Sequence, residues 1–371
     1  MPFCCVAISC LFLINGLGMG NSTRCHAVIE NLAAAGVSVH VLTSGNGLKY
    51  FANRPGIASL NEMASFYYSG TNGGVSGWAT IKTVGKLAKL AQAKRAKLEQ
   101  IIEQVRPDIA VTDSEYATAP LRKRKIPIAA INNSEVVVTE FLKHRRDAKG
   151  VRSHFWFVEF SDYLFHRQFC DLILSPYPLR TPTRHPKFRR IGLIVRRNVR
   201  EIIASTPEPN LSPKQLKNVV FMLSGSVHAT LVNFDGRDFP FNVDVVGRDG
   251  NSHGNVKFHG RLMNNTELLA RADALVINGG YSALSEAFAF RKPTFVLPVP
   301  GHAEQFINAR LASDLGLGFQ VTEADLLPRL MEMYDKDTWI GRQGLPPKFE
   351  IHGDVEAAEG ILELARQAGK K

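Results

Sequence analysis

Short, fully apolar runs alternate with longer amphipathic stretches along this chain, and this alternation constrains the fold more than any other feature. In the first half, strands are expected at 8–15, 37–44, 108–114 and 126–134, with helices near 22–35, 82–106 and 116–124. A second series starts afresh, with strands expected at 219–226, 241–247, 256–260, 274–280 and 293–299. Apolar runs of this length between helical segments are typical of parallel strands that are buried on both faces. The pattern predicts an α/β protein with two Rossmann-like sheets.

The length of 371 residues fits two domains of ordinary size. We expect a first domain over residues 1–203, a proline-rich linker over 204–215 and a second domain over 216–353. An amphipathic helix is expected within 354–371, where it could pack back onto the first domain. Ligands of such sheets bind beyond the carboxyl ends of the strands, so a cleft between the two halves is the expected site.

The balance of charge favours anionic partners. Lysine and arginine number 45 against 34 aspartates and glutamates, which gives a net charge of +11. Phosphorylated substrates and an anionic membrane surface are therefore candidate partners, whereas nucleic acid is not expected, because no recognition motif accompanies the charge. Basic and aromatic residues interleave over 136–170. This segment is interpreted either as helical core with a charged surface or as a patch that meets an anionic membrane or a lipid-linked acceptor.

The N-terminus is apolar but does not resemble an export signal in full. Residues 1–23 carry no charged side chain, and the run has neither a basic start nor a clear cleavage site. It is also too short and too interrupted by glycine to span a bilayer, so we expect a buried first strand. The five cysteines lack the spacing of a metal site, which favours a reducing, cytoplasmic compartment.

A glycine-rich turn follows the first expected strand. It reads Gly16-Leu-Gly18-Met-Gly20-Asn21, and a helix is expected directly after it. Glycines allow close approach of a ligand to the backbone, and the following helix presents free N–H groups. The dinucleotide-binding fingerprint needs a glycine where Asn21 stands, and no acidic residue ends the second strand. A hydride-transfer enzyme is therefore not favoured.

A more specific constellation spans residues 277–309. A strand ends in Gly279-Gly280 and a helix is expected to begin near Ser282, so the amides of 281–283 and the Ser282 hydroxyl could hold a pyrophosphate. Glu286 lies one helical turn later on the same face, where a carboxylate could accept hydrogen bonds from a ribose. Glu304 and Gln305 open the next helix, where they could bind sugar hydroxyls.

In these motifs the chain resembles glycosyltransferases of the GT-B superfamily, closest to the family 28 and UDP-glycosyltransferase-like groups. Their donor-site pattern is matched by 277–309, their N-terminal glycine pattern by 16–24, and a Gly-Ser turn of the donor domain by Gly225-Ser226. The resemblance implies the GT-B fold, in which two Rossmann-like domains face each other across a cleft. It also implies transfer of a sugar from a nucleotide diphosphate sugar, with UDP as the default nucleotide, to an acceptor hydroxyl, by an inverting reaction without a metal or other cofactor.

The resemblance assigns the donor to the second domain and the acceptor, a carbohydrate, lipid-linked or small molecule, to the first. Residues on the acceptor-side loop are Gly18, Gly20 and Arg24. The implied donor-binding residues are Gly225, Ser226, His259, Arg261, Gly279, Gly280, Tyr281, Ser282, Ala283, Glu286, His302, Glu304 and Gln305. The protein is expected in the cytoplasm, with peripheral attachment to the inner face of the membrane as a further expectation.

The catalytic base is the point at which the chain departs from the family. Many relatives carry a histidine at the position of Asn21, and an asparagine cannot take a proton at neutral pH. Asp113 follows an expected strand and is the candidate base, although it could instead orient a neighbour or cap the next helix. Glu115 is a weaker candidate, and His26 is interpreted as a packed or surface histidine. Two alternatives remain open, namely a catalytically silent sugar- or lipid-binding relative and a nucleotide-sugar 2-epimerase.

Overall fold

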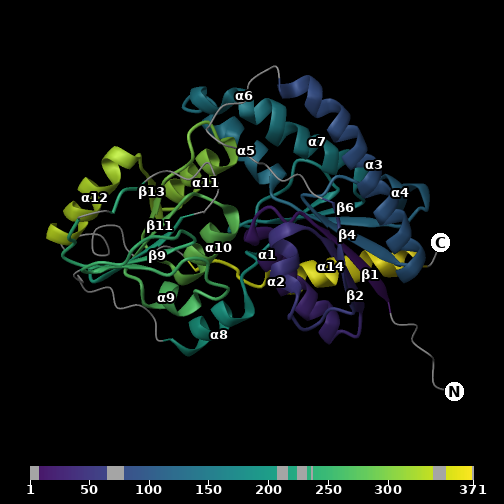
Figure 1. The fold of residues 1–371 in the computed structure, drawn as a ribbon, viewed down its shortest axis with the longest axis horizontal. Helices are drawn as coiled ribbons and strands as arrows, with labels where there is room; N and C mark the ends of the chain where they lie inside the picture. The colour runs from purple at the N-terminus through teal and green to yellow at the C-terminus, as the bar shows by residue number, and fades with distance from the viewer. Residues whose placement is uncertain are drawn as a thin grey trace. The chain divides into compact units, whose positions relative to one another are not determined.

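The computed structural model describes residues 8–64, 79–206, 216–223, 232–234, 237–336 and 348–369. The chain forms two compact units. Unit 1 comprises 1–135, 162–194 and 352–371, and unit 2 comprises 136–161 and 195–351. Each unit contains one parallel sheet with helices alternating along the chain (Figure 1). The predicted α/β fold with two Rossmann-like sheets is thereby confirmed.

Unit 1 is built on a seven-stranded sheet in the order β3-β2-β1-β4-β5-β6-β7. Its strands are β1 (Ser9–Ile14), β2 (Ser38–Thr43), β3 (Ser59–Glu62), β4 (Ile109–Asp113), β5 (Ile128–Ile131), β6 (Leu172–Pro176) and β7 (Phe188–Ile191). Its helices are α1 (Met19–Ala34), α2 (Gly45–Phe51), α3 (Ala79–Val105), α4 (Ala119–Lys123), α7 (Phe160–Phe169, which begins in unit 2) and α14 (Gly353–Ala368). Every strand pairing is parallel, and β1 is buried as expected of the apolar N-terminal run.

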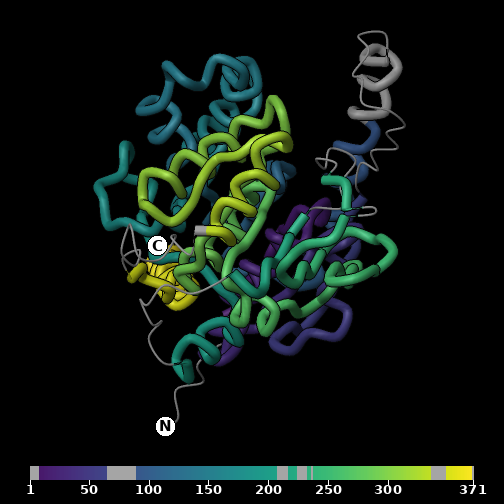
Figure 2. Tube along the Cα trace, turned by 90° about the vertical axis from the view of Figure 1, so that its left-hand side faces the viewer, coloured from purple at the N-terminus to yellow at the C-terminus, as the bar shows by residue number. Residues whose placement is uncertain are grey.

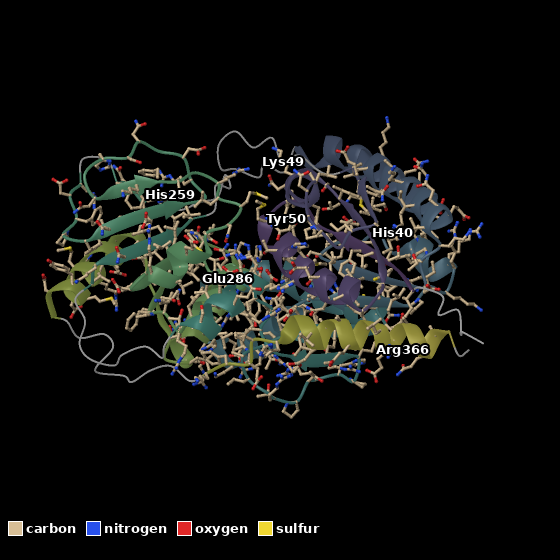
Figure 3. All side chains as sticks on the ribbon, turned by 90° about the horizontal axis from the view of Figure 1, so that it is seen from below. His40, Lys49, Tyr50, His259, Glu286 and Arg366 are labelled. Carbon is tan, nitrogen blue, oxygen red and sulfur yellow. The ribbon has the colours of Figure 1, made fainter. Side chains whose placement is uncertain are left out.

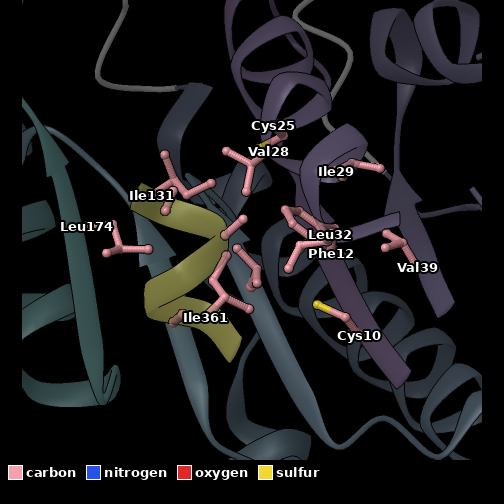
Figure 4. Packing of buried hydrophobic residues seen from close by; sticks show 14 of the residues in the cluster. Cys10, Phe12, Cys25, Val28, Ile29, Leu32, Val39, Ile131, Leu174 and Ile361 are labelled. Carbon is pink, nitrogen blue, oxygen red and sulfur yellow. The ribbon is translucent and has the colours of Figure 1, made fainter. Parts of the chain in front are cut away.

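The last helix, α14, completes the core of unit 1. It packs against α1 and β4–β7, and Ile361 lies in one cluster with Phe12 and Leu32 (Figure 4). A Cβ atom at Gly353 would lie 1.9 Å from the backbone oxygen of Gly192, so only glycine allows this helix to start here. Residues 352–371 are thus an integral part of unit 1, although the segment directly before them, 195–351, belongs to unit 2.

Unit 2 repeats the same strand order, as β10-β9-β8-β11-β12-β13. Its strands are β8 (Asn218–Met222), β9 (Asn242–Val246), β10 (Val256–Phe258), β11 (Ala274–Ile277), β12 (Thr294–Val296) and β13 (Gly318–Gln320). Its helices include α8 (Arg197–Ser205), α9 (Thr266–Arg271), α10 (Tyr281–Phe290), α11 (Ala303–Asp314) and α12 (Glu323–Lys336). In doubly wound sheets of this order, ligands bind where the connections diverge, which is between β8 and β11 here and between β1 and β4 in unit 1.

The segment 136–161 belongs to unit 2, although the sequence placed it in the first domain. It contains most of α5 (Ser134–His144), a 3-10 turn η1 (Lys149–Val151), α6 (Arg152–His154) and the π-helix η2 (Phe155–Glu159). The segment lies beside α11 (Figure 2), and Lys143 and His144 bind Asp314 at the end of that helix. These polar contacts join residues about 170 positions apart, and neither partner's local pattern indicates the other. Residues 195–203 likewise belong to unit 2, and 207–215 of the expected linker lie outside the described residues.

None of the helices within the described ranges combines the length and the apolar composition needed to cross a bilayer.

Cys10, Cys25 and Cys170 are buried free thiols. Burial raises the pKa of the Cys170 thiol to about 12. Figure 4 shows Cys10 of β1 and Val39 of β2, which lie in the same apolar cluster.

Candidate functional site

The turn between β11 and α10 has the geometry expected of a backbone that approaches a ligand. Gly279 has a φ of +82°, and a Cβ there would lie 3.0 Å from both the Gln305 oxygen and a Val296 methyl group. Gly280 is exposed, precedes the first residue of α10, and would place a Cβ in open space. Gly279 is therefore required by packing, whereas Gly280 leaves the N-terminus of α10 accessible.

Hydrogen bonds tie the start of α11 to this turn. The Asn308 side-chain amide donates to the Gly279 oxygen at 2.8 Å, and the Gln305 Oε1 accepts from the Val299 amide at 2.8 Å. His302 caps α11, with Nδ1 3.5 Å from the Gln305 amide. The three motif pieces of the sequence thus form one connected structure. Asn308 lies within the motif at 277–309, and its side chain joins α11 to the β11–α10 turn.

Glu286 is buried in α10, and its carboxylate is held by a guanidinium group. Arg196 donates from Nε to Oε1 at 2.6 Å and from Nη2 to Oε2 at 2.9 Å, and it also binds Asn265 Oδ1 at 2.6 Å. Figure 3 shows Glu286 within unit 2. Arg196 was missed by sequence reasoning, because it lies 90 positions from its partner and its only signal was the basic character of 180–200. The paired geometry fixes the direction in which the carboxylate points.

The loop after β10 is anchored within unit 2. His259 Nε2 lies 2.6 Å from Asp244 Oδ1, and its backbone amide donates to the Val245 oxygen at 2.9 Å (His259 is labelled in Figure 3). Arg271 also contacts Asp244, at 3.2 Å. Arg261 is exposed in the same loop. Gly225 and Ser226, the Gly-Ser turn of the resemblance, lie outside the described residues.

In unit 1 the N-terminal glycine turn divides into a packed and an open part. A Cβ at Gly16 would lie 1.6 Å from the Ser44 oxygen, whereas a Cβ at Gly18 would meet nothing within 4 Å. Because α1 begins at Met19, Gly20 and Asn21 stand in its first turn instead of in a loop. Asn21 Oδ1 lies 3.4 Å from the guanidinium of Arg24.

Asp113 is fully buried at the end of β4 and forms a bidentate ion pair with Arg24. The two bonds measure 2.6 Å from Nε and 2.5 Å from Nη2, and the Cys25 thiol lies 3.2 Å from Oδ2. Thr118 precedes α4, so Asp113 does not cap that helix. The interpretation of Asp113 as a helix cap is therefore wrong, and its contact with Arg24 fits the interpretation that it orients a neighbour. Arg24 is likewise a buried partner within α1 and not part of an exposed loop.

The two weaker candidates also have structural roles. Glu115 binds the Lys94 ammonium at 2.7 Å and accepts the amides of Tyr116 and Ala117. His26 is buried with its ring edge-on to Tyr50 and Phe51, and burial lowers its pKa. Of the two interpretations of His26, packed or surface, the structure supports the packed one.

The architecture and the connected motif of unit 2 define a GT-B glycosyltransferase. The sequence model of glycosyl transferase family 1 matches residues 8–336, and the chain belongs to this family. An uncharacterized glycosyltransferase of Methanosarcina acetivorans is 23% identical over 97% of this chain and 99% of its own length. The recognition of a GT-B enzyme from the motifs is thereby confirmed, and the protein is a transferase.

Solved structures show the same fold at low identity. The glycotransferase of kitacinnamycin superposes with a TM-score of 0.60 and 16% identity, covering 98% of both chains. The Streptomyces sp. SF2575 glycosyltransferase SsfS6, complexed with thymidine diphosphate, superposes with a TM-score of 0.58 and 14% identity, covering 98% of this chain and all of that one.

Proposed function

We propose that this glycosyltransferase uses a nucleoside diphosphate sugar and binds it in unit 2, at the β11–α10 turn. The observation that carries the proposal is the exposed Gly280 at the N-terminus of α10, held next to α11 through the Asn308–Gly279 bond. The amides of 281–283 and the Ser282 hydroxyl would hold the diphosphate, because a helix N-terminus favours negative charge. Tyr281 and Ala283 contribute to this turn, and His302, Glu304 and Gln305 are assigned to the sugar.

Glu286 is assigned to the ribose, and its pairing with Arg196 supports that role. A free carboxylate would repel the diphosphate, whereas a carboxylate neutralised by a guanidinium group does so much less. Each carboxylate oxygen has more than one acceptor direction, so Glu286 can accept a ribose hydroxyl while Arg196 holds it. The loop at His259 and Arg261 would meet the base through its backbone. Gly225 and Ser226 remain assigned to the phosphates on the resemblance alone.

The proposed nucleotide is UDP, with dTDP as its direct competitor. A relative that matches over 27% of this chain is named as an uncharacterized UDP-glucosyltransferase, and two structural neighbours hold thymidine diphosphate. The reaction is proposed to invert the anomeric centre and to use the helix dipole and basic groups to stabilise the leaving diphosphate.

Asp113 is proposed as a positioning residue for α1 instead of the base. Asp113 is 0% exposed, so an acceptor hydroxyl cannot reach its carboxylate, and both of its oxygens accept from Arg24. Asn21 can hydrogen-bond an acceptor hydroxyl but cannot deprotonate it. Without a positioned base, transfer should be slower by about 10²–10⁴ than with one. A silent relative would bind donor without any turnover, and a 2-epimerase would convert donor without an acceptor.

Replacing Glu286 tests the donor assignment. Glu286→Gln keeps the shape of the side chain but loses its charge, and we expect donor affinity to fall by about 10–100-fold, since hydrogen bonds to charged groups contribute about 1.5–3 kcal/mol. Calorimetric titration with UDP- and dTDP-sugars measures the affinity, and thermal melting of the ligand-free variant checks the fold. Glu323→Gln, at an exposed glutamate of α12, is the matched control and should bind as the parent does. Equal donor affinity in both variants contradicts the assignment.

A second proposal concerns the acceptor. Trp156, Phe157 and Val158 are exposed, Phe157 at 82%, within a segment whose neighbouring arginines and lysine are also exposed: Arg145, Arg146, Lys149 and Arg152. Aromatic side chains flanked by basic groups suit an anionic membrane surface, so we propose a lipid-linked acceptor that is met there.

Vesicle binding tests this surface. Phe157→Ser should weaken binding to vesicles that contain an anionic lipid by about tenfold or more, because burial of a phenylalanine side chain contributes about 1.5–3 kcal/mol. Co-sedimentation with anionic and with zwitterionic vesicles measures the binding. Leu262→Ser is the matched control, since Leu262 is an exposed apolar residue of unit 2 that lies outside the segment 136–161. Absence of binding to anionic vesicles, or equal binding by both variants, contradicts the proposal.

A further inference from the structure

The π-helix η2 brings together two side chains that an α-helix would separate. His154 and Glu159 are five residues apart, and in an α-helix this spacing turns them roughly 140° from each other. A π-helical turn bonds residues five apart and therefore places them on one face. In the structure the His154 Nδ1 lies 3.4 Å from the Glu159 Oε1. Single π-turns inside helices occur frequently at functional sites.

A third side chain completes the group from a distant part of unit 2. His302 stands in the loop before α11, and its ring centroid lies 4.9 Å from that of His154 at an interplanar angle of 34°. One ligand atom from each of His154, Glu159 and His302 lies within 4.8 Å of the other two. Imidazole nitrogens and a carboxylate oxygen bind zinc at about 2.0–2.2 Å, so a small side-chain rotation would bring all three onto one ion.

We propose that His154, Glu159 and His302 form a binding site for a divalent transition metal of the zinc class. Two imidazoles and one carboxylate favour zinc, iron, nickel or copper over magnesium and calcium, which prefer oxygen ligands. Three protein ligands leave a coordination position for water or another small ligand, which is the pattern of an open site and not of a closed structural one. The site shares His302 with the residues proposed to bind the donor sugar, but the metal site is tested without any nucleotide sugar.

A second cluster of similar composition in unit 2 is not proposed as a metal site, because a lysine ammonium lies between its side chains. Glu140, His144 and Asp314 also lie close enough to share an ion. There, however, the Lys143 ammonium binds Asp314 and lies 3.5 Å from Glu140 Oε2. The ammonium already supplies the positive charge that a metal ion would bring to these carboxylates. This lysine-filled cluster serves as an internal control, because it offers a histidine in the same unit.

Occupation of the proposed site would act on the start of α11. His302 caps this helix, whose first turn carries Glu304 and Gln305, and His154 Nδ1 lies 3.4 Å from the Ala303 amide. A metal ion bound to both histidines would link η2 to this cap and restrict its motion. The metal-bound state should therefore protect the amides at the start of α11 from exchange.

Metal titration of the full chain tests the site. After treatment with a chelator, the protein is titrated with Zn²⁺ by calorimetry and with Co²⁺ by visible absorption, without any nucleotide sugar. We expect one strong site, and His154→Ala and His302→Ala should each weaken it by roughly 100-fold or more, since even outer-shell partners of metal ligands contribute 10–100-fold. His144→Ala should bind as the parent does.

Glu159→Gln keeps both histidines and nearly the same volume, so it tests the third ligand even if a histidine variant fails to fold. It should lower the affinity by about tenfold or more and alter the Co²⁺ absorption. Thermal melting without metal compares the folds of the variants. No binding by the parent, or equal binding by His154→Ala and His144→Ala, overturns the proposal. Because the titration contains no nucleotide sugar, this failure would leave the donor assignment untouched.

Discussion

Arg24→Ala is expected to destabilise unit 1 by about 3–5 kcal/mol, because removing one partner of a buried ion pair leaves the other charge uncompensated. Asp113 is fully buried and Arg24 is 8% exposed, so water cannot replace the lost guanidinium. The pair joins α1 to β4 through two short bonds. Urea unfolding measures the loss of stability. Amide hydrogen exchange in α1 and β4 shows whether the loss lies in unit 1.

Two further variants identify the origin of this effect. Arg95→Ala removes an exposed pair with Glu99 and should change stability by less than about 0.5 kcal/mol. The combined change Arg24→Met and Asp113→Leu should recover most of the loss, since apolar residues of similar volume often replace a buried pair without cost. If Asp113→Asn instead abolished sugar transfer while stability stayed at the parent value, Asp113 would be a catalytic base and the positioning role would be wrong.

Gly16→Ala is the second change with a large expected effect, a loss of about 3 kcal/mol or more from unit 1. The added Cβ would lie 1.6 Å from the Ser44 oxygen and 2.5 Å from its carbonyl carbon, which are backbone atoms that cannot rotate away. The start of α2 would have to shift, because Ser44 directly precedes it. Chemical denaturation of the two single variants at Gly16 and Gly18 measures the difference.

Gly18→Ala is the matched control for this substitution. Gly18 has a φ of −114°, which alanine adopts, and a Cβ there meets open space. As the residue before α1, it should cost at most about 1 kcal/mol when replaced by alanine. Equal stability of the two variants would contradict the division of the turn into a packed and an open glycine.

Local pattern predicted nine of the thirteen strands in the described residues and missed β3, β6, β7 and β13. Buried parallel strands are short apolar runs, and the run 8–15 became β1 (Ser9–Ile14) because both of its faces are covered. Helix starts were less predictable. α1 begins at Met19, three residues before the expected start, because Gly20 and Asn21, which the sequence pattern placed in the glycine turn, are already helical. For residues 136–170 a helical core with a charged surface was one of two interpretations left open, and the sequence pattern did not identify what such a core packs against.

The sequence predicted the parts of the candidate site whose residues lie within one motif. It did not predict contacts between residues that lie far apart in the chain. Gly279 and Asn308 lie within one motif, and the structure joins them. The partners of Glu286 and Asp113 lie 90 and 89 positions away, so neither ion pair could be read from spacing. The pairing of His154 with Glu159 was hidden because helical periodicity assumes 3.6 residues per turn, and a π-turn breaks that rule.

Amide hydrogen exchange with and without the tightest-binding nucleotide sugar tests the central claim most directly, because it locates the ligand in the chain. A donor bound at the β11–α10 turn should slow exchange at the amides of 281–286 and at the start of α11, residues 303–306. The same protection should weaken in Glu286→Gln. Protection confined to unit 1, or no protection with any UDP- or dTDP-sugar at saturating concentration, would contradict the donor site.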